Sequence, residues 1–214
     1  MKWDELTDLL RRELRAPLPG HDDFLELSGY KRPDLEAARA QHPPPRESAV
    51  LALLYEANDE SHVLLMLRPT YEGVHSGQVS FPGGRREGSD VDLEATALRE
   101  FAEETGADTT DIQLLGALTP VYIPPSRSLV TPFVGMRRAL GSLAPDPREV
   151  AELIHAPLAM LLRDDILKQR DQYIAIMGRS VHIPYFDVNG HVVWGATAMM
   201  IAELRALLRR SVQA

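Results

Sequence analysis

Residues 81–107, with the sequence FPGGRREGSDVDLEATALREFAEETGA, join a pair of glycines to a long helical pattern. At 100° per residue, Glu100, Glu103 and Glu104 fall within an arc of about 100° on such a helix. The opposite side, which we expect to pack against the core, carries Ala95, Leu98, Phe101, Ala102 and Thr105. The segment therefore predicts a glycine loop followed by a helix with one packed face and one acidic face.

The three carboxylates are in an unfavourable place for a helix. Gly106 is suited to end the helix in left-handed conformation, so Glu103 and Glu104 lie beside the negative end of the helix dipole. Each like-charge pair at i,i+4 costs about 0.2–0.5 kcal/mol, and the dipole adds a penalty of similar order. A divalent cation reverses this sign, because carboxylate oxygens are preferred ligands of Mg²⁺ and Mn²⁺. A solvated acidic face is the alternative interpretation.

The neighbours of this stripe favour the metal site. Paired glycines let the backbone approach a ligand or ion closely, and the start of a helix favours phosphate. Arg99 lies at the edge of the acidic stripe, where a charge-assisted hydrogen bond can hold the loop or a glutamate in place. An exposed helix arginine is the alternative interpretation for Arg99.

The composition limits the class of protein. The 214 residues, 44% of them hydrophobic and 25% charged, are enough for one domain with a sizeable core. The absence of cysteine excludes disulfides and thiolate metal sites. A formal charge of −8 argues against nucleic acid as a partner, so an acidic protein that handles phosphates needs a cation or a focused basic pocket. The sequence shows no signal peptide or membrane-spanning run, so we expect a cytoplasmic protein.

The chain divides near residue 45. Residues 1–15 have apolar positions at helical spacing and predict an amphipathic helix, and the proline-rich stretch that follows predicts an irregular wrap. We therefore expect a leading segment over residues 1–45 and the main domain over 46–214. The amphipathic leading helix and the C-terminal helix are equally suited to form a homodimer interface or to cap their own core.

The main domain mixes strands and helices. Apolar runs predict strands at 48–57, 62–69, 111–123, 129–138 and 148–155, a hairpin over 165–188 centred on MGRS, and a closing helix at 194–210. Most strands are joined by short links, which favours an α+β arrangement of layers over a parallel doubly wound sheet.

Together, the glycine loop and REFAEETG at 99–106 resemble the Nudix box, the metal-binding loop and helix of Nudix pyrophosphohydrolases. Arg99 follows Gly84 by one position more than in the usual pattern. The glutamate expected midway therefore has no clean counterpart. Its candidates are Asp90, Asp92 and Glu94, and none of them is assigned a role.

Residues 64–84, LLMLRPTYEGVHSGQVSFPGG, are similar to the additional signature of the coenzyme A pyrophosphatase branch of that family. The matching positions are Leu64, Leu65, Arg68, His75, Gly77, Val79, Phe81, Pro82, Gly83 and Gly84. Met66 replaces a threonine of the signature, Glu87 replaces an aspartate, and Gly73 stands where a basic residue is common. WGATA at 194–198 is also similar to that branch.

The resemblance implies a Nudix fold, a mixed sheet sandwiched between helices, here with an N-terminal helical extension. It implies that Glu100 and Glu104 are the principal ligands of Mg²⁺ or Mn²⁺, with the Gly84 carbonyl as a backbone ligand. Glu103 is then a further ligand or the general base, and Arg99, which matches the arginine of the box, is a catalytic candidate beside it. For the base, Glu149 and Glu152 stay open as alternatives.

The implied activity is cleavage of coenzyme A or acyl-coenzyme A to 3′,5′-ADP and 4′-phosphopantetheine. An ADP-ribose or nucleoside-triphosphate pyrophosphohydrolase and a non-catalytic nucleotide-sensing module are the alternatives. Arg68 and His75 are candidates for contacting a substrate phosphate, and Arg127 is a candidate for the 3′-phosphate of coenzyme A. Candidates for stacking on adenine are Tyr71, Tyr122 and Tyr185.

Overall fold

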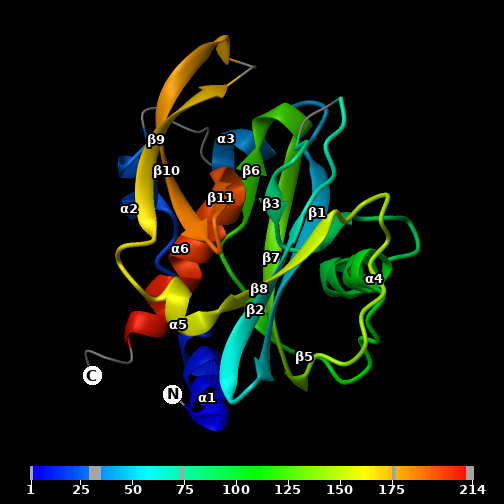
Figure 1. Cartoon of the computed structure of the whole chain (residues 1–214). Coiled ribbons are helices and arrows are strands. Elements are labelled where there is room, and N and C mark those ends of the chain that lie inside the picture. The colour runs from blue at the N-terminus through cyan, green and yellow to red at the C-terminus, as the bar shows by residue number, and fades with distance from the viewer. Residues whose placement is uncertain (1, 29–34, 73–74, 175–176, 211–214) are drawn as a thin grey trace.

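The computed structural model describes all residues except 1, 29–34, 73–74, 175–176 and 211–214 (Figure 1). The leading helix α1 (Trp3–Glu13) forms as predicted, and its apolar face, which includes Leu6 and Leu10, is buried in the core. The stretch after α1 is more regular than the predicted wrap, because it contains the short helices α2 (Asp22–Glu26) and α3 (Leu35–Arg39). No helix of the described residues is both long and apolar enough to cross a bilayer.

The larger sheet is mixed and has eight strands. They are β1 (Arg46–Ala57), β2 (Glu60–Leu67), β3 (Val79–Ser80), β4 (Gly83–Arg85), β5 (Gln113–Ala117), β6 (Val121–Ile123), β7 (Ser128–Ala139) and β8 (Glu152–Pro157). The central pair, β1 and β7, is parallel, while β2 and β4 run antiparallel to β1. This arrangement confirms the α+β prediction.

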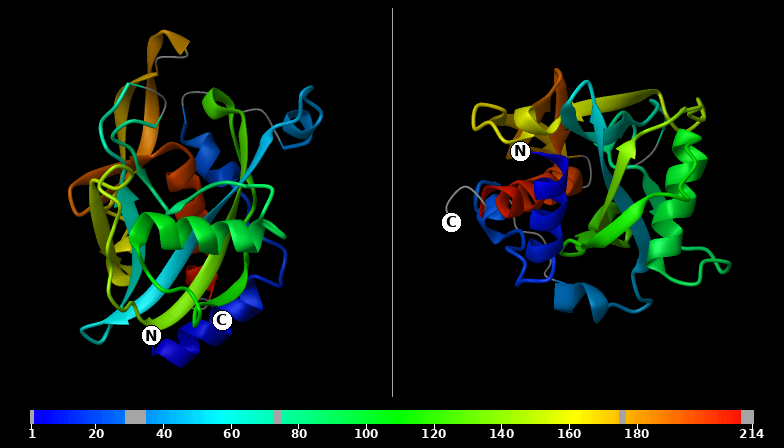
Figure 2. Two further views of the ribbon diagram at one scale, coloured as in Figure 1. Left: turned by 90° about the vertical axis from the view of Figure 1, so that its right-hand side faces the viewer. Right: turned by 90° about the horizontal axis from the view of Figure 1, so that it is seen from below.

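Two helices cover opposite faces of this sheet. Along β1, Leu51 and Leu53 belong to the core under helix α4 (Leu93–Thr105), and Ala52 and Leu54 belong to the core on the other side, with helix α6 (Gly195–Arg209). Because both faces are covered, the strand is a continuous apolar run. Figures 1 and 2 show the sheet between α4 and α6.

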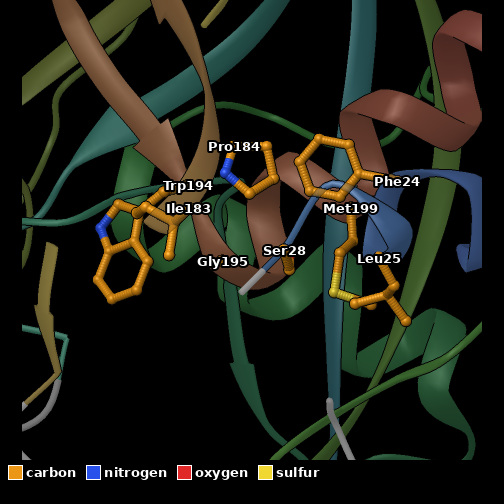
Figure 3. Close-up of a pocket in the computed structure, with 8 residues that line it drawn as sticks. All are labelled: Phe24, Leu25, Ser28, Ile183, Pro184, Trp194, Gly195 and Met199. Atoms are coloured by element: carbon orange, nitrogen blue, oxygen red, sulfur yellow. The ribbon is translucent and has the colours of Figure 1, made fainter. Parts of the chain in front are cut away.

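A second, three-stranded sheet consists of β9 (Leu167–Ile174), β10 (Arg179–Val188) and β11 (His191–Trp194), and follows the short helix α5 (Leu158–Leu161). Its β10 packs on the leading segment, where the Phe24 and Phe186 rings stack with centroids 5.7 Å apart. A cavity of about 10 Å³ remains between Phe24, Pro184 and Met199 (Figure 3). That volume is near the space of one water molecule, so this gap is no substrate site.

Two sequence predictions need correction in detail, and a third is confirmed. The strand expected at 111–123 is two strands, β5 and β6, because the chain between them turns its Thr119 amide toward α6 rather than toward a strand. The strand expected from Arg148 begins at Glu152, after a turn in which the Val150 amide donates to the Asp146 carbonyl. The predicted hairpin is present as β9 and β10, although residues 175–176 of its connection lie outside the described residues.

A buried carboxylate connects the leading segment to the rest of the molecule. Glu203 on α6 is 1% exposed and accepts hydrogen bonds from the Gly20 amide at 3.0 Å, the Thr119 amide at 2.9 Å and the Thr119 hydroxyl at 2.6 Å. His21 Nε2 lies 3.4 Å from the same carboxylate. Burial alone would raise the pKa of Glu203, but the partners His21 and Thr119 hold it below its ordinary value.

Candidate active site

The loop before α4 is fixed by Gly83. This residue pairs with Val50 of β1 at a φ of 150°, and a Cβ at this position would lie 2.3 Å from the Ala49 carbonyl oxygen. Only glycine fits such a close approach of two backbones. The Gly83 amide points away from the strand pair and donates to Glu104 Oε2 at 2.7 Å, so the loop orients a carboxylate of the helix.

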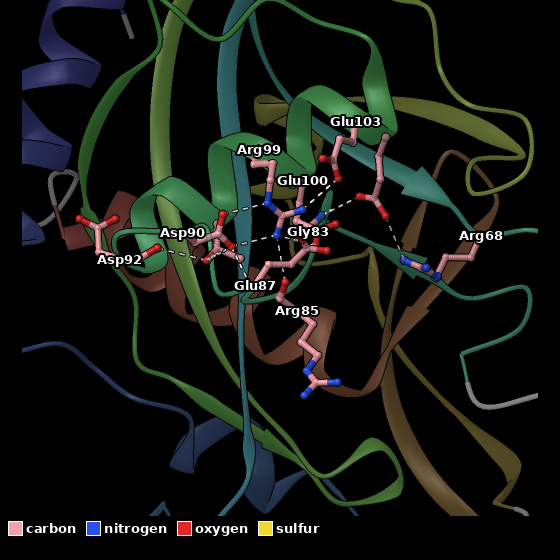
Figure 4. A network of polar contacts seen from close by, with 11 residues as sticks. Arg68, Gly83, Arg85, Glu87, Asp90, Asp92, Arg99, Glu100 and Glu103 are labelled. Carbon is pink, nitrogen blue, oxygen red and sulfur yellow. Dashed lines mark hydrogen bonds and ion pairs between the residues drawn. The ribbon is translucent and has the colours of Figure 1, made fainter.

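Glu104 is the buried member of the acidic stripe. It is 1% exposed, and Arg68 Nη1 donates to its Oε1 at 3.3 Å (Figure 4). Burial raises the pKa of Glu104 to about 7, and the negative charges of Glu100 and Glu149 act in the same direction. The predicted division of α4 into a packed face and an acidic face is therefore wrong at this residue, since Glu104 lies within the packed face together with Phe101 and Thr105.

Glu100 lies one helical turn earlier, against the second glycine of the loop. A Cβ on Gly84 would meet the Glu100 carboxyl carbon at 2.5 Å. Burial raises the pKa of Glu100, partly offset by Arg99, whose Nη2 donates to Oε1 at 3.1 Å. Two carboxylates with raised pKa values, four residues apart on one helix, form the centre of the site.

Arg99 joins the helix to the loop that precedes it (Figure 4). Its Nε and Nη2 donate to the two oxygens of Asp90 at 2.9 and 3.0 Å, Nη2 also donates to the Arg85 carbonyl at 3.0 Å, and Nη1 donates to Glu103 at 2.9 Å. The forked contact with Asp90 is the strong geometry for guanidinium and carboxylate. Asp90 and the Arg85 carbonyl therefore fix the direction of Arg99.

The candidates for the midway acid, Asp90, Asp92 and Glu94, take different places in the structure. Asp92 caps the helix by accepting from the Ala95 amide at 2.8 Å, and Glu94 is exposed in the first turn. Asp90 is buried and also accepts from the Glu87 amide and the Thr96 hydroxyl. Of the three acids near the expected midway position, Asp90 alone contacts Arg99, a contact that no periodicity of the sequence indicates.

The loop between β7 and β8 brings a further acid to this end of the helix. The Ala144 and Asp146 amides donate to the carbonyls of Thr105 and Glu104 at 2.9 and 3.2 Å. Glu149 follows in this loop, and its charge raises the pKa of both Glu100 and Glu104. In the described part of the chain, Glu149 has no ion pair.

The NUDIX domain family matches residues 45–175 of the chain. The chain belongs to the Nudix family. Nudix hydrolase 15, mitochondrial, of Arabidopsis thaliana is 35% identical over 161 residues, which cover 72% of this chain and 55% of that protein. The human mitochondrial coenzyme A diphosphatase NUDT8 is 35% identical over 162 residues, which cover 73% of this chain and 66% of that protein. The chain thus spans little more than half the length of the Arabidopsis relative.

A solved structure supports the fold. The crystal structure of the Nudix hydrolase RenU from M. smegmatis superimposes with a TM-score of 0.54 at 18% identity, and covers 78% of this chain and 87% of that one. At this identity the likeness shows a common Nudix fold, in agreement with the mixed sheet between helices.

Nudix hydrolases generally use divalent metal ions, and the residues present here fit one. Glu100 and Glu104 are desolvated carboxylates without full neutralisation, as their raised pKa values indicate. The described residues contain no closed group of three or more acidic or histidine side chains around one point. Mg²⁺ is commonly held by one or two carboxylates plus water and substrate phosphate oxygens, and Glu100 and Glu104 could supply those carboxylates.

The predicted substrate contacts fall in different places. Arg68 contacts the acidic centre, and His75 Nδ1 lies 3.2 Å from Gln78 Oε1 in the loop before β3. Arg127 is not brought to the carboxylates, since it contacts the Pro43 carbonyl at the start of β7. Glu152 contacts His191 at 3.4 Å.

The three tyrosines are separated as well. Tyr122 donates to Gln41, Tyr185 lies beneath Arg170, and Tyr71 is exposed. Gly73, at the departure from the branch signature, lies outside the described residues.

Proposed function

We propose that this protein is a Mg²⁺- or Mn²⁺-dependent Nudix pyrophosphohydrolase that cleaves the diphosphate of coenzyme A or acyl-coenzyme A. The observation that carries the activity is the carboxylate pair Glu100 and Glu104, held against Gly84 and Gly83. A bound divalent ion would neutralise the diphosphate and help to ionise the attacking water. Because the protein carries a net charge of −8, the bound cation would also reverse the local negative field and so allow an anionic substrate to bind.

The protein's own groups orient this centre. The Gly83 amide and Arg68 each hold one oxygen of Glu104, so the remaining lone pairs point in fixed directions. Asp90 positions Arg99, and Arg99 in turn restrains Glu100 and Glu103. A preorganised arrangement of this kind lowers the cost of reaching the transition state.

Hydrolysis also needs a base for the water proton. When the water oxygen bonds to phosphorus and the bridging P–O bond breaks, a carboxylate accepts the proton. Glu103 is the base that the family resemblance implies, but its side chain is 60% exposed and paired with Arg99. Glu149 is the candidate we favour, because its negative charge acts on both Glu100 and Glu104 and it has no ion pair in the described residues.

Coenzyme A as substrate is supported by the signature at residues 64–84 and by the similarity to human NUDT8, which is named a coenzyme A diphosphatase. The test is to incubate the purified protein and Mg²⁺ with coenzyme A, acetyl-coenzyme A, ADP-ribose, NADH, diadenosine polyphosphates and deoxynucleoside triphosphates, and to identify products by mass. We expect 3′,5′-ADP and 4′-phosphopantetheine from coenzyme A, and no turnover in excess EDTA.

A matched pair of variants controls this experiment. Glu104→Gln should lose turnover while remaining folded, and Glu94→Gln, an exposed change on the same helix, should keep it. If coenzyme A is inert while ADP-ribose turns over, the substrate assignment is wrong. Activity that persists in excess EDTA would contradict the metal-dependent mechanism.

A further inference from the structure

A polar cavity of about 380 Å³ lies between the loop before β3 and the three-stranded sheet. The loop contributes Ser76 and Gln78, β9 contributes Arg170 and Gln172, and β11 contributes His191 and Trp194. This volume lies within the range of small-molecule sites, which is about 300–1,000 Å³. The acidic centre described above uses none of these six side chains.

The end of β2 links the cavity to the acidic centre. Leu67 of β2 lines it, and the next residue, Arg68, reaches Glu104. The Arg68 amide donates to the carbonyl of Gln78, a lining residue, at 3.0 Å. On the other side, Glu152 pairs with Leu67 and its carboxylate lies 3.4 Å from His191. The two sites therefore involve consecutive residues of the chain at the end of β2.

The charge of the lining is opposite to that of the protein. None of the described residues that line the cavity is acidic, although the chain carries a net charge of −8. Arg170 donates to the neutral amide oxygen of Gln172 and lies over the Tyr185 ring at 5.9 Å, and it has no carboxylate partner in the described residues. A guanidinium without a counter-ion, beside amide and hydroxyl groups, is suited to bind a phosphate.

We propose that this cavity binds the phosphorylated ribose of the substrate, with Arg170 as the main contact of its phosphomonoester and His191, Gln172 and Ser76 as further donors. The inference rests on the proposed function for the orientation of the substrate, and it replaces Arg127 as the residue for the 3′-phosphate. The cavity is too large for a phosphate alone, and the Trp194 indole supplies an apolar wall for the sugar.

The test compares coenzyme A with 3′-dephospho-coenzyme A, which differ only in that phosphomonoester. We expect Arg170→Gln to lower kcat/KM for coenzyme A by ~10–100-fold, mainly through KM, and to leave dephospho-coenzyme A nearly unchanged. His191→Gln should act in the same direction with a smaller loss. Arg179→Gln, an exposed change on β10 of the same sheet, is the control for surface charge. An equal loss on both substrates would overturn the inference.

A binding measurement separates this inference from the proposed function. Calorimetry with 3′,5′-ADP and with 5′-AMP, in the Glu104→Gln background, should show tighter binding of 3′,5′-ADP and the loss of that difference when Arg170→Gln is added. If this holds while coenzyme A is not cleaved, the cavity assignment stands and the proposed function fails. A different outcome is that coenzyme A is cleaved while Arg170→Gln changes neither the preference for coenzyme A over dephospho-coenzyme A nor the preference for 3′,5′-ADP over 5′-AMP. In that case the cavity assignment fails and the proposed function stands. Thermal unfolding confirms that each variant is folded.

Discussion

Arg99 donates two parallel hydrogen bonds to Asp90, from Nε to Oδ1 at 2.9 Å and from Nη2 to Oδ2 at 3.0 Å. The guanidinium of Arg99, together with the Glu87 amide, holds the pKa of Asp90 far below its ordinary value. Asp90 is therefore charged near neutral pH, and its contact with Arg99 predicts a positioning role.

This relationship predicts the effect of Asp90→Asn. The variant keeps the shape of the side chain but replaces one acceptor of the fork by an NH₂ group, so Arg99 loses its fixed direction. We expect metal affinity or kcat to fall by ~10–100-fold, as is usual for residues that orient a metal site indirectly. Asp92→Asn is the control, because asparagine caps a helix as well as aspartate. Unchanged kinetics for Asp90→Asn would contradict the positioning role.

The two loop glycines should respond differently to alanine. At Gly83 the new Cβ would overlap the Ala49 backbone at a positive φ, and we expect the free energy of unfolding to fall by about 2–3 kcal/mol. At Gly84 the new Cβ meets only the end of the Glu100 side chain, so the fold should survive while Glu100 is displaced and activity is lost. Urea unfolding and steady-state kinetics on both variants test this, and an active Gly84→Ala protein would be the unfavourable result.

The assignment of the base is tested by single amide substitutions. Glu149→Gln should lower kcat by ~10²–10⁴-fold with little change in KM. Glu103→Gln and Glu152→Gln should cost less, because the first carboxylate is paired with Arg99 and the second contacts His191. A pH–rate profile completes the comparison, since loss of the base should remove the acidic limb. A larger loss for Glu103→Gln would return the base to the position that the family resemblance implies.

The raised pKa of Glu104 predicts a pH-dependent stability of the metal-free protein. The folded state holds a proton up to about pH 7, whereas the unfolded chain releases it near 4.5. The free energy of unfolding should therefore fall as pH rises through this window and then level off. In EDTA, the stability of Glu104→Gln relative to the natural sequence should increase from pH 5 to pH 8 by roughly 2–3 kcal/mol.

Urea titrations of both proteins at pH 5 and pH 8 measure this relative stability. The contributions of other titrating groups largely cancel, because both proteins contain them. Added Mg²⁺ should reduce the difference between the two pH values, because a nearby cation favours the charged carboxylate. If the relative stability of Glu104→Gln is the same at both pH values, Glu104 is not protonated in the folded protein at pH 5, and its environment is misassigned.

The elements with a clear hydrophobic pattern could be predicted from the sequence. The continuous apolar runs gave β1, β2 and β7, and helical spacing together with Gly106 gave α4, whose end is confirmed by a left-handed Gly106 that donates to the Ala102 carbonyl. The break between β5 and β6 could not be predicted, because it depends on Thr119 finding Glu203, which lies 84 residues away.

The site shows the same division. Glu100 and Glu104 could be selected because the helix period and the resemblance agree on them. The roles of Asp90 and Arg170 depend on contacts across loops and between sheets, which have no local signature. Glu104 also shows that a residue which helical spacing places on the acidic face can be buried in the structure. The loop that contains Gly83 contacts its carboxylate.

Glu203 couples the leading segment to the C-terminal helix α6, because it accepts a hydrogen bond from the Gly20 amide. After a cut between α2 and β1, we expect α1 and Gly20 to stay on α6 at neutral pH, because their departure would deprive the buried Glu203 of the Gly20 amide. Acid acts against this contact: His21 and Thr119 hold the pKa of Glu203 below its ordinary value, so only strong acid protonates it in the folded protein. We therefore expect acid of that strength to weaken the attachment of the leading segment to α6.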